Sequence, residues 1–87
     1  MTQLEQTIIA NAKRELAVVL VYYGQKAAGI KAAKGEDAWL EYLGHYNSLN
    51  ALLSLAHQAE SGLSEEGTQA LLDIEAQHTE AYRIMAS

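Results

Sequence analysis

The sequence predicts an all-α protein, a three-helix antiparallel bundle in one domain spanning residues 1–87, paired as an intertwined or side-by-side homodimer. Three observations predict this architecture. The 87 residues include no Pro, while Ala, Leu, Glu and Gln are abundant, which favours helix throughout. Gly and Ser divide the chain into three stretches, at Gly24, Gly29, Gly35 and Ser61–Gly62. Because 15 of the 43 apolar residues are Ala, a monomer would have a thin core, and we expect self-association.

The first helix is expected over residues 2–34. Thr2 and Glu5 have the spacing of a capping box, and Gly35 suits the left-handed position after a helix end. Apolar residues recur every three or four positions between these limits, at Leu4, Ile8, Ala12, Leu16, Val19, Tyr23, Ala27 and Ile30. A helix of this length would span about 48 Å. It is longer than the other two, so it either bends at Gly24 or extends beyond them to meet another copy.

The second and third helices are expected over residues 36–61 and 64–86. Glu36 and Asp37 place negative charge where a helix begins, and Ser64 is a suitable N-cap. The main apolar stripe of the second helix comprises Trp39, Tyr42, Leu43, Tyr46, Leu49, Leu53 and Ala56. That of the third comprises Leu71, Ile74, His78, Ala81 and Met85. The connections are short, so consecutive helices should be antiparallel.

Residues 16–23 form an unbroken apolar run that would be apolar around its whole circumference as a helix. The same residues would also suit a short buried strand, but the chain offers no second strand to pair with it, which favours helix. An all-round apolar helix needs cover on every side, and a second copy would supply it. The predicted dimer interface is therefore Leu16, Val18, Val19, Leu20 and Val21, with Leu52 and Leu55 from a second stripe on the middle helix.

Aromatic residues gather near the end of the first helix and the start of the second. They are Tyr and Trp only, types that combine a large apolar surface with a polar group and that dominate interface hot spots. Two interpretations stay open, ordinary packing at the edge of the core and a docking site for a protein partner. The candidate partner-binding residues are Trp39, Tyr42, Tyr46, Tyr22 and Tyr23.

Three histidines lie beside carboxylates at helical spacing. Glu75 and His78 match the E-x-x-H pattern of di-iron helical bundles, in which side chains three residues apart converge on one metal. The set is incomplete, because such a site needs a second copy of the motif and two further Glu residues. The favoured interpretation of His78 is a core-edge histidine bonded to a Tyr hydroxyl, a backbone carbonyl or Glu75. His45, four residues after Glu41, and His57, three before Glu60, are further metal candidates that more simply form solvated pairs.

Charge is distributed unevenly along the chain. Residues 1–34 carry a net +3 and residues 35–87 a net −8, which gives the overall −5. The basic residues of the first helix, Lys13, Arg14, Lys26, Lys31 and Lys34, could face nucleic acid, but the acidic total disfavours that partner. The simpler interpretation is that basic residues at the edge of the first helix form ion pairs with acidic residues in the rest of the chain. The start of the chain does not resemble a secretory leader and no apolar run could span a membrane, so we expect a cytoplasmic protein.

The sequence offers no constellation for catalysis. No Ser lies in a nucleophile-elbow context, no Lys completes a phosphate-binding loop near Gly62, and no Cys is present. We therefore expect no enzyme and no cofactor. The leading interpretation is a small acidic protein–protein interaction module of the adaptor, chaperone, antitoxin or inhibitor type, acting as a homodimer. The alternatives are a dimeric metal-binding bundle using Glu75 and His78, and a nucleic-acid-associated regulator.

Overall fold

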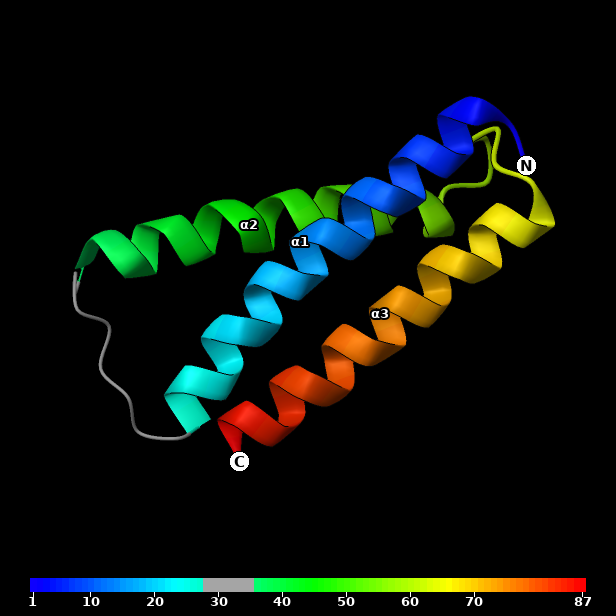
Figure 1. Ribbon diagram of the computed structural model, residues 1–87. Helices are drawn as coiled ribbons and strands as arrows, with labels where there is room; N and C mark the ends of the chain where they lie inside the picture. Colours follow the sequence, from blue (N-terminus) through cyan, green and yellow to red (C-terminus); the bar gives the residue numbers. More distant parts are fainter. Residues whose placement is uncertain (28–35) are drawn as a thin grey trace.

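The computed structural model describes residues 1–27 and 36–87, and these residues are almost entirely helical. The elements are α1 (Gln3–Ala27), α2 (Glu36–Ser54), a short 3₁₀ helix η1 (Leu55–His57) and α3 (Glu65–Ala86) (Figure 1). The all-α prediction is confirmed, since no strand occurs within the two described ranges. Residues 16–23 lie inside α1, so the strand alternative for them is wrong.

Helix α1 is the element against which the other two pack. It crosses in front of α2, while α3 lies beside it and runs in the same direction (Figure 1). α2 runs the opposite way, as expected for helices joined by short connections. α2 and α3 meet near η1 and diverge from there, so they touch each other much less than each touches α1.

The core follows one face of α1. Its buried residues advance by three or four positions, which matches the apolar period in the sequence: Ile9, Ala12, Leu16, Val19 and Tyr23. The other helices complete the core with Tyr42, Leu49, Leu53, Leu71 and Ile74. A single helix face therefore organises most of the buried surface.

The end of α2 differs from the expected one, and the end of the first helix cannot be compared with its expected position. α1 is continuous through Gly24 to Ala27, and the predicted end at residues 34–35 lies outside the described residues. α2 ends at Ser54 and not near residue 61, because the chain tightens into η1 and then becomes extended at Gln58. The Ser54 hydroxyl donates to the Ala51 carbonyl at 2.7 Å, a local bond that competes with continued α-helix.

The start of α3 follows the sequence prediction. The Ser64 side chain caps the helix by accepting a hydrogen bond from the Gly67 amide at 3.1 Å. Gly62, with φ of +79°, adopts the left-handed conformation that reverses the chain before it. None of the described helices is both long enough and apolar enough to cross a membrane.

Candidate functional site

A hydrogen-bonded cluster of Tyr and His side chains joins the three helices in the core. The Tyr23 hydroxyl of α1 lies 2.9 Å from the Tyr42 hydroxyl of α2 and 2.7 Å from Nε2 of His78 in α3. All three residues are buried, and only 8% of His78 is exposed. Of the three partners expected for a core-edge His78, the structure shows the Tyr hydroxyl, and Tyr23 supplies it.

Burial keeps every member of this cluster uncharged at neutral pH. It raises the pKa of Tyr23, and the hydrogen bond with Tyr42 adds to that increase. It likewise raises the pKa of Tyr42 and lowers the pKa of His78. Tyrosines with such raised pKa values are poor nucleophiles and poor proton donors, so the cluster supplies a neutral hydrogen-bonded chain.

The neutral chain can be oriented in two ways. In one, Tyr42 donates to Tyr23, which donates to Nε2 of His78, leaving the proton of the imidazole on Nδ1. In the other, Nε2–H donates to Tyr23, which donates to Tyr42, and Nδ1 is free to accept. Nδ1 of His78 has no hydrogen-bond partner among the described residues. Every fully buried side-chain nitrogen or oxygen in those residues does have a partner, so Nδ1 must be accessible to solvent.

The five candidate partner-binding aromatics do come together. Tyr22 stacks on Tyr42 with ring centroids 4.2 Å apart, while Trp39 and Tyr46 lie 5.5 and 5.6 Å from the same ring. Their exposure differs sharply. Tyr23 and Tyr42 are buried, Tyr22 and Tyr46 are half-buried, and only Trp39 is open to solvent, at 45%.

One further aromatic residue, Tyr82, belongs to this cluster and was not among the sequence candidates. Its ring lies 5.9 Å from that of Tyr23 and 6.4 Å from that of His78. The signal in the sequence is its position four residues after His78, which places both on one face of α3.

The other two histidines bind carboxylates on different helices and not their sequence neighbours. Nδ1 of His45 lies 2.5 Å from Glu15 in α1, although Glu41 is four residues away in the same helix. Nε2 of His57 lies 2.9 and 3.0 Å from the two carboxylate oxygens of Glu75. The expected pairing of His57 with Glu60 is therefore replaced by one to α3. Each pair connects separate elements because the fold, and not the helical repeat, brings the partners together.

These pairings separate the residues of the proposed E-x-x-H metal site. Nε2 of His78 is engaged by Tyr23, whereas Glu75 is bound by His57. In the described part of the chain, no three His, Asp or Glu side chains are grouped so that they could hold a metal ion. The geometry therefore gives no support to convergence of Glu75 and His78 on one metal.

Glu5 fastens the start of α1 to the start of α3. The predicted capping box is present, since the Glu5 amide donates to the Thr2 hydroxyl at 3.1 Å. The Glu5 carboxylate also accepts hydrogen bonds from the Ser64 amide at 3.0 Å and the Ser64 hydroxyl at 2.6 Å. These bonds with Ser64 lower the pKa of Glu5. The sequence indicated the cap but not the contact 59 residues away.

The outward face of α1 is apolar towards its C-terminal end. Val18, Leu20 and Val21 are exposed there, with 61% of Val21 open to solvent. Leu16 and Val19, which were also expected in a dimer interface, lie instead in the chain's own core, because they share the face of α1 that packs on the other helices. The remaining two candidates, Leu52 and Leu55, are half-buried against that core.

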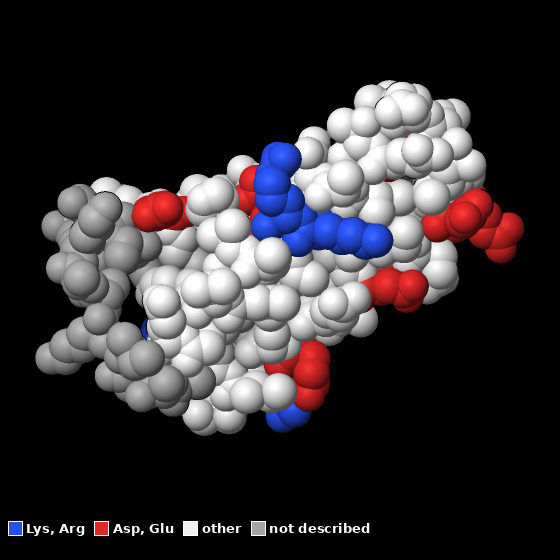
Figure 2. Space-filling model, viewed as in Figure 1, with Lys and Arg blue, Asp and Glu red and all other residues white. Residues whose placement is uncertain are grey.

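A basic patch lies over the middle of α1, and much of the surface beyond it, towards the C-terminal end of the helix, is uncharged (Figure 2). Lys13 and Arg14 are exposed in this part of α1. Neither forms an ion pair with any residue that the structure describes. The expected ion pairs between the first helix and the acidic remainder are therefore not seen for these two residues.

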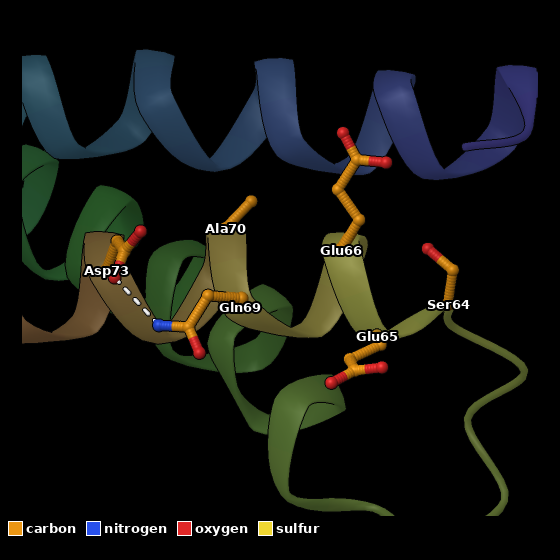
Figure 3. A pocket seen from close by; sticks show the side chains of 6 residues that line it. All are labelled: Ser64, Glu65, Glu66, Gln69, Ala70 and Asp73. Atoms are coloured by element: carbon orange, nitrogen blue, oxygen red, sulfur yellow. Dashed lines mark hydrogen bonds between the residues drawn. The ribbon is translucent and has the colours of Figure 1, made fainter.

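Four surface hollows lined by described residues bear on the site. A wide one of about 720 Å³ lies over the start of α3, but Glu65 and Glu66 point in opposite directions and Asp73 bonds to Gln69 at 2.9 Å (Figure 3). Its carboxylates therefore do not converge. Two smaller apolar grooves flank the outward face of α1. The one between α1 and α3 has about 210 Å³ and includes Leu20 and Ile84; the one between α1 and α2 has about 160 Å³ and includes Val18 and Val21.

The fourth hollow, which we call the α2–α3 groove, has about 290 Å³ and is the one that reaches His78. It lies where the two helices diverge. Its lining combines aromatic rings with hydrogen-bonding groups: Tyr46, Asn50, Leu53, Glu75, His78, Thr79 and Tyr82.

No family model, curated protein or solved structure matches this chain, so its sites are interpreted from their own geometry.

Proposed function

We propose that this chain is a small helical protein–protein interaction module that acts as a homodimer and has no catalysis of its own. The observation that carries the proposal is the exposed apolar face of α1. Val18, Leu20 and Val21 lie on one helix, outside the core, with an apolar groove on either side. Apolar surface gathered in this way is typical of a face that another protein covers.

A second copy of the chain suits this surface because the surface is self-complementary. A twofold dimer places the same patch of both copies in contact, so each copy must present both a projection and a recess. The side chain of Val21 projects from α1, and the groove beside Leu20 and Ile84 provides the recess. Burying one such side chain contributes roughly 1.5–3 kcal/mol, so a few of them on each copy favour association.

A different protein partner would dock at Trp39. Trp39 and Leu40 are both exposed at the start of α2, where Trp39 lies against the ring of Tyr42. A large aromatic side chain that is open to solvent yet held on a rigid cluster is the kind of residue that forms an interface hot spot. This second surface would let the homodimer act as an adaptor or inhibitor.

The two alternative functions have weaker support. The metal-binding alternative requires Glu75 and His78 to turn from His57 and Tyr23 towards a common ion. A nucleic-acid interface would depend on Lys13, Arg14 and Lys26 of α1, because Lys31 and Lys34 lie outside the described residues. Neither alternative accounts for the exposed apolar face beside the basic patch.

Sedimentation velocity at micromolar concentrations tests the homodimer. We expect the wild-type chain to sediment as a dimer and Val21→Glu to sediment as a monomer with unchanged helical circular dichroism. Leu4→Glu is the matched control, because Leu4 is 69% exposed on α1 but lies far from the patch, and this variant should remain dimeric. A wild-type monomer, or equal behaviour of the two variants, would overturn the proposal.

A further inference from the structure

The α2–α3 groove combines features that suit one class of ligand. Two tyrosine rings lie near His78, with the Tyr46 centroid 5.6 Å and the Tyr82 centroid 6.4 Å from the imidazole. The Glu75 carboxylate lines the same groove, one helical turn before His78. The groove lies between α2 and α3 and shares no lining residue with the two grooves beside the helix face proposed for dimerisation.

The electrostatics of the groove favour a cation and disfavour an anion. Glu75 brings a negative charge, and the described lining residues include no Lys or Arg. The lowered pKa of His78 keeps its imidazole neutral, so the described lining residues themselves bring no positive charge, and the groove's contact with His57 is confined to the Glu75 carboxylate. The faces of Tyr rings attract cations through their quadrupole, which adds to the same preference.

Each polar side chain of the groove can accept a hydrogen bond, His78 in one of its two tautomers. Glu75 offers carboxylate lone pairs beyond those taken by His57, and Asn50 and Thr79 offer further oxygens. Nδ1 of His78 accepts when the Tyr23 chain runs from Nε2–H towards Tyr42. A primary ammonium or a guanidinium brings several N–H donors and no acceptor, which complements this set.

We propose that the α2–α3 groove binds an organic cation, an ammonium or guanidinium group carried on an apolar stem, with its charge at Glu75 and its stem between Tyr46 and Tyr82. The groove has a volume of about 290 Å³ and is open to solvent, so it can take the end of a side chain or a small amine while the rest of a larger molecule stays outside. Two sources supply such a group: a free amine, and a Lys or Arg side chain of a partner protein.

The first test is a titration of the full chain, followed by amide chemical shifts, with 2-phenylethylammonium as the probe. We expect saturable binding with a Kd of about 1 mM, the affinity that a fragment of this size achieves. The matched anion, 3-phenylpropionate, should not bind. Equal binding of the anion, or no saturation by the cation, would overturn the proposal.

Two pairs of variants assign the binding to named residues. Glu75→Gln should weaken the cation at least fivefold, whereas Glu80→Gln removes the same charge outside the groove and should leave the Kd within twofold. Both variants should fold, because these carboxylates are solvent-accessible and pairs at such sites contribute little to stability. Tyr82→Phe should leave the Kd for the cation unchanged, and Tyr82→Leu should raise it at least threefold. Equal effects of the two Glu variants would refute the assignment.

The source of the cation is distinguished with N-acetyl-arginine amide, which mimics a side chain within a peptide. Tighter binding of this compound than of 2-phenylethylammonium would indicate a partner's side chain, and the reverse order would indicate a free amine. Either order supports the site, while absence of binding by both compounds rejects it. This outcome is independent of the dimer test, because the two surfaces share no residue.

Discussion

Nε2 of His78 lies 2.7 Å from the hydroxyl of Tyr23, which precedes it by 55 residues, and the same hydroxyl lies 2.9 Å from that of Tyr42. One oxygen atom on α1 thus connects α2 and α3. Buried polar groups stabilise a fold only when they are paired, so the removal of this oxygen has a definite consequence.

Tyr23→Phe should lower the free energy of unfolding by about 1–3 kcal/mol, because it leaves a buried imidazole nitrogen and the Tyr42 hydroxyl without their partner. Tyr22→Phe is the control, since Tyr22 stacks on Tyr42 but its hydroxyl makes no hydrogen bond with a described residue. That variant should change stability by less than about 0.5 kcal/mol. Urea denaturation of both variants makes the comparison, and equal effects would show that the hydroxyl chain is unimportant.

His78 should titrate with a midpoint below about 6.5, the ordinary value for imidazole, because burial lowers its pKa. The groups that face it are the Tyr23 hydroxyl and the rings of Tyr46 and Tyr82, with the Glu75 carboxylate one turn away. Between the folded-state pKa and 6.5 the unfolded chain binds more protons at this residue, so its contribution to stability falls as the pH decreases through that window. The proton shifts of the imidazole ring measure the midpoint directly, and a value at or above 6.5 would contradict this account.

Glu5→Gln should destabilise the protein at pH 7, and the difference from wild type should shrink on acidification. The pKa of Glu5 is lowered in the folded state by its bonds with Ser64, from an ordinary value near 4.5. Its contribution is therefore complete above pH 4.5 and is lost as the pH falls through the folded-state value. Denaturation at pH 7 and pH 3 checks the prediction. Glu66→Gln is the control, because Glu66 is exposed in the first turn of α3. Its difference in stability from wild type should not shrink in the same way between pH 7 and pH 3.

Gly67→Ala should lower the melting temperature, although Ala is normally favoured over Gly within a helix by about 1 kcal/mol. An added Cβ at residue 67 would overlap the Glu5 carboxylate, and Glu5 can withdraw only by giving up its bonds with Ser64. Gly44→Ala is the matched control, because nothing lies within 4 Å of a Cβ added there. This control should raise the melting temperature. An increase in both variants would mean that Glu5 moves at no cost.

The helical class and the core face of α1 could be predicted from the sequence because both depend on local properties. Helix propensity acts residue by residue, and the three- or four-residue repeat that contains Leu16, Val19 and Tyr23 identifies a face without reference to a partner. The caps at Thr2 and Ser64 were predictable for the same reason, since each bond spans three residues.

The pairing of the charged and polar side chains was decided only by the tertiary structure. Helical spacing offered Glu41 to His45 and Glu60 to His57, yet these histidines bind Glu15 and Glu75 on other helices. The same is true of Glu5, whose carboxylate reaches Ser64 across 59 residues. A carboxylate three or four positions away in a helix is a neighbour on an exposed surface, where an ion pair contributes little. Packing of apolar faces fixes which helices approach, and that approach, which no local pattern encodes, determined the partner of each histidine.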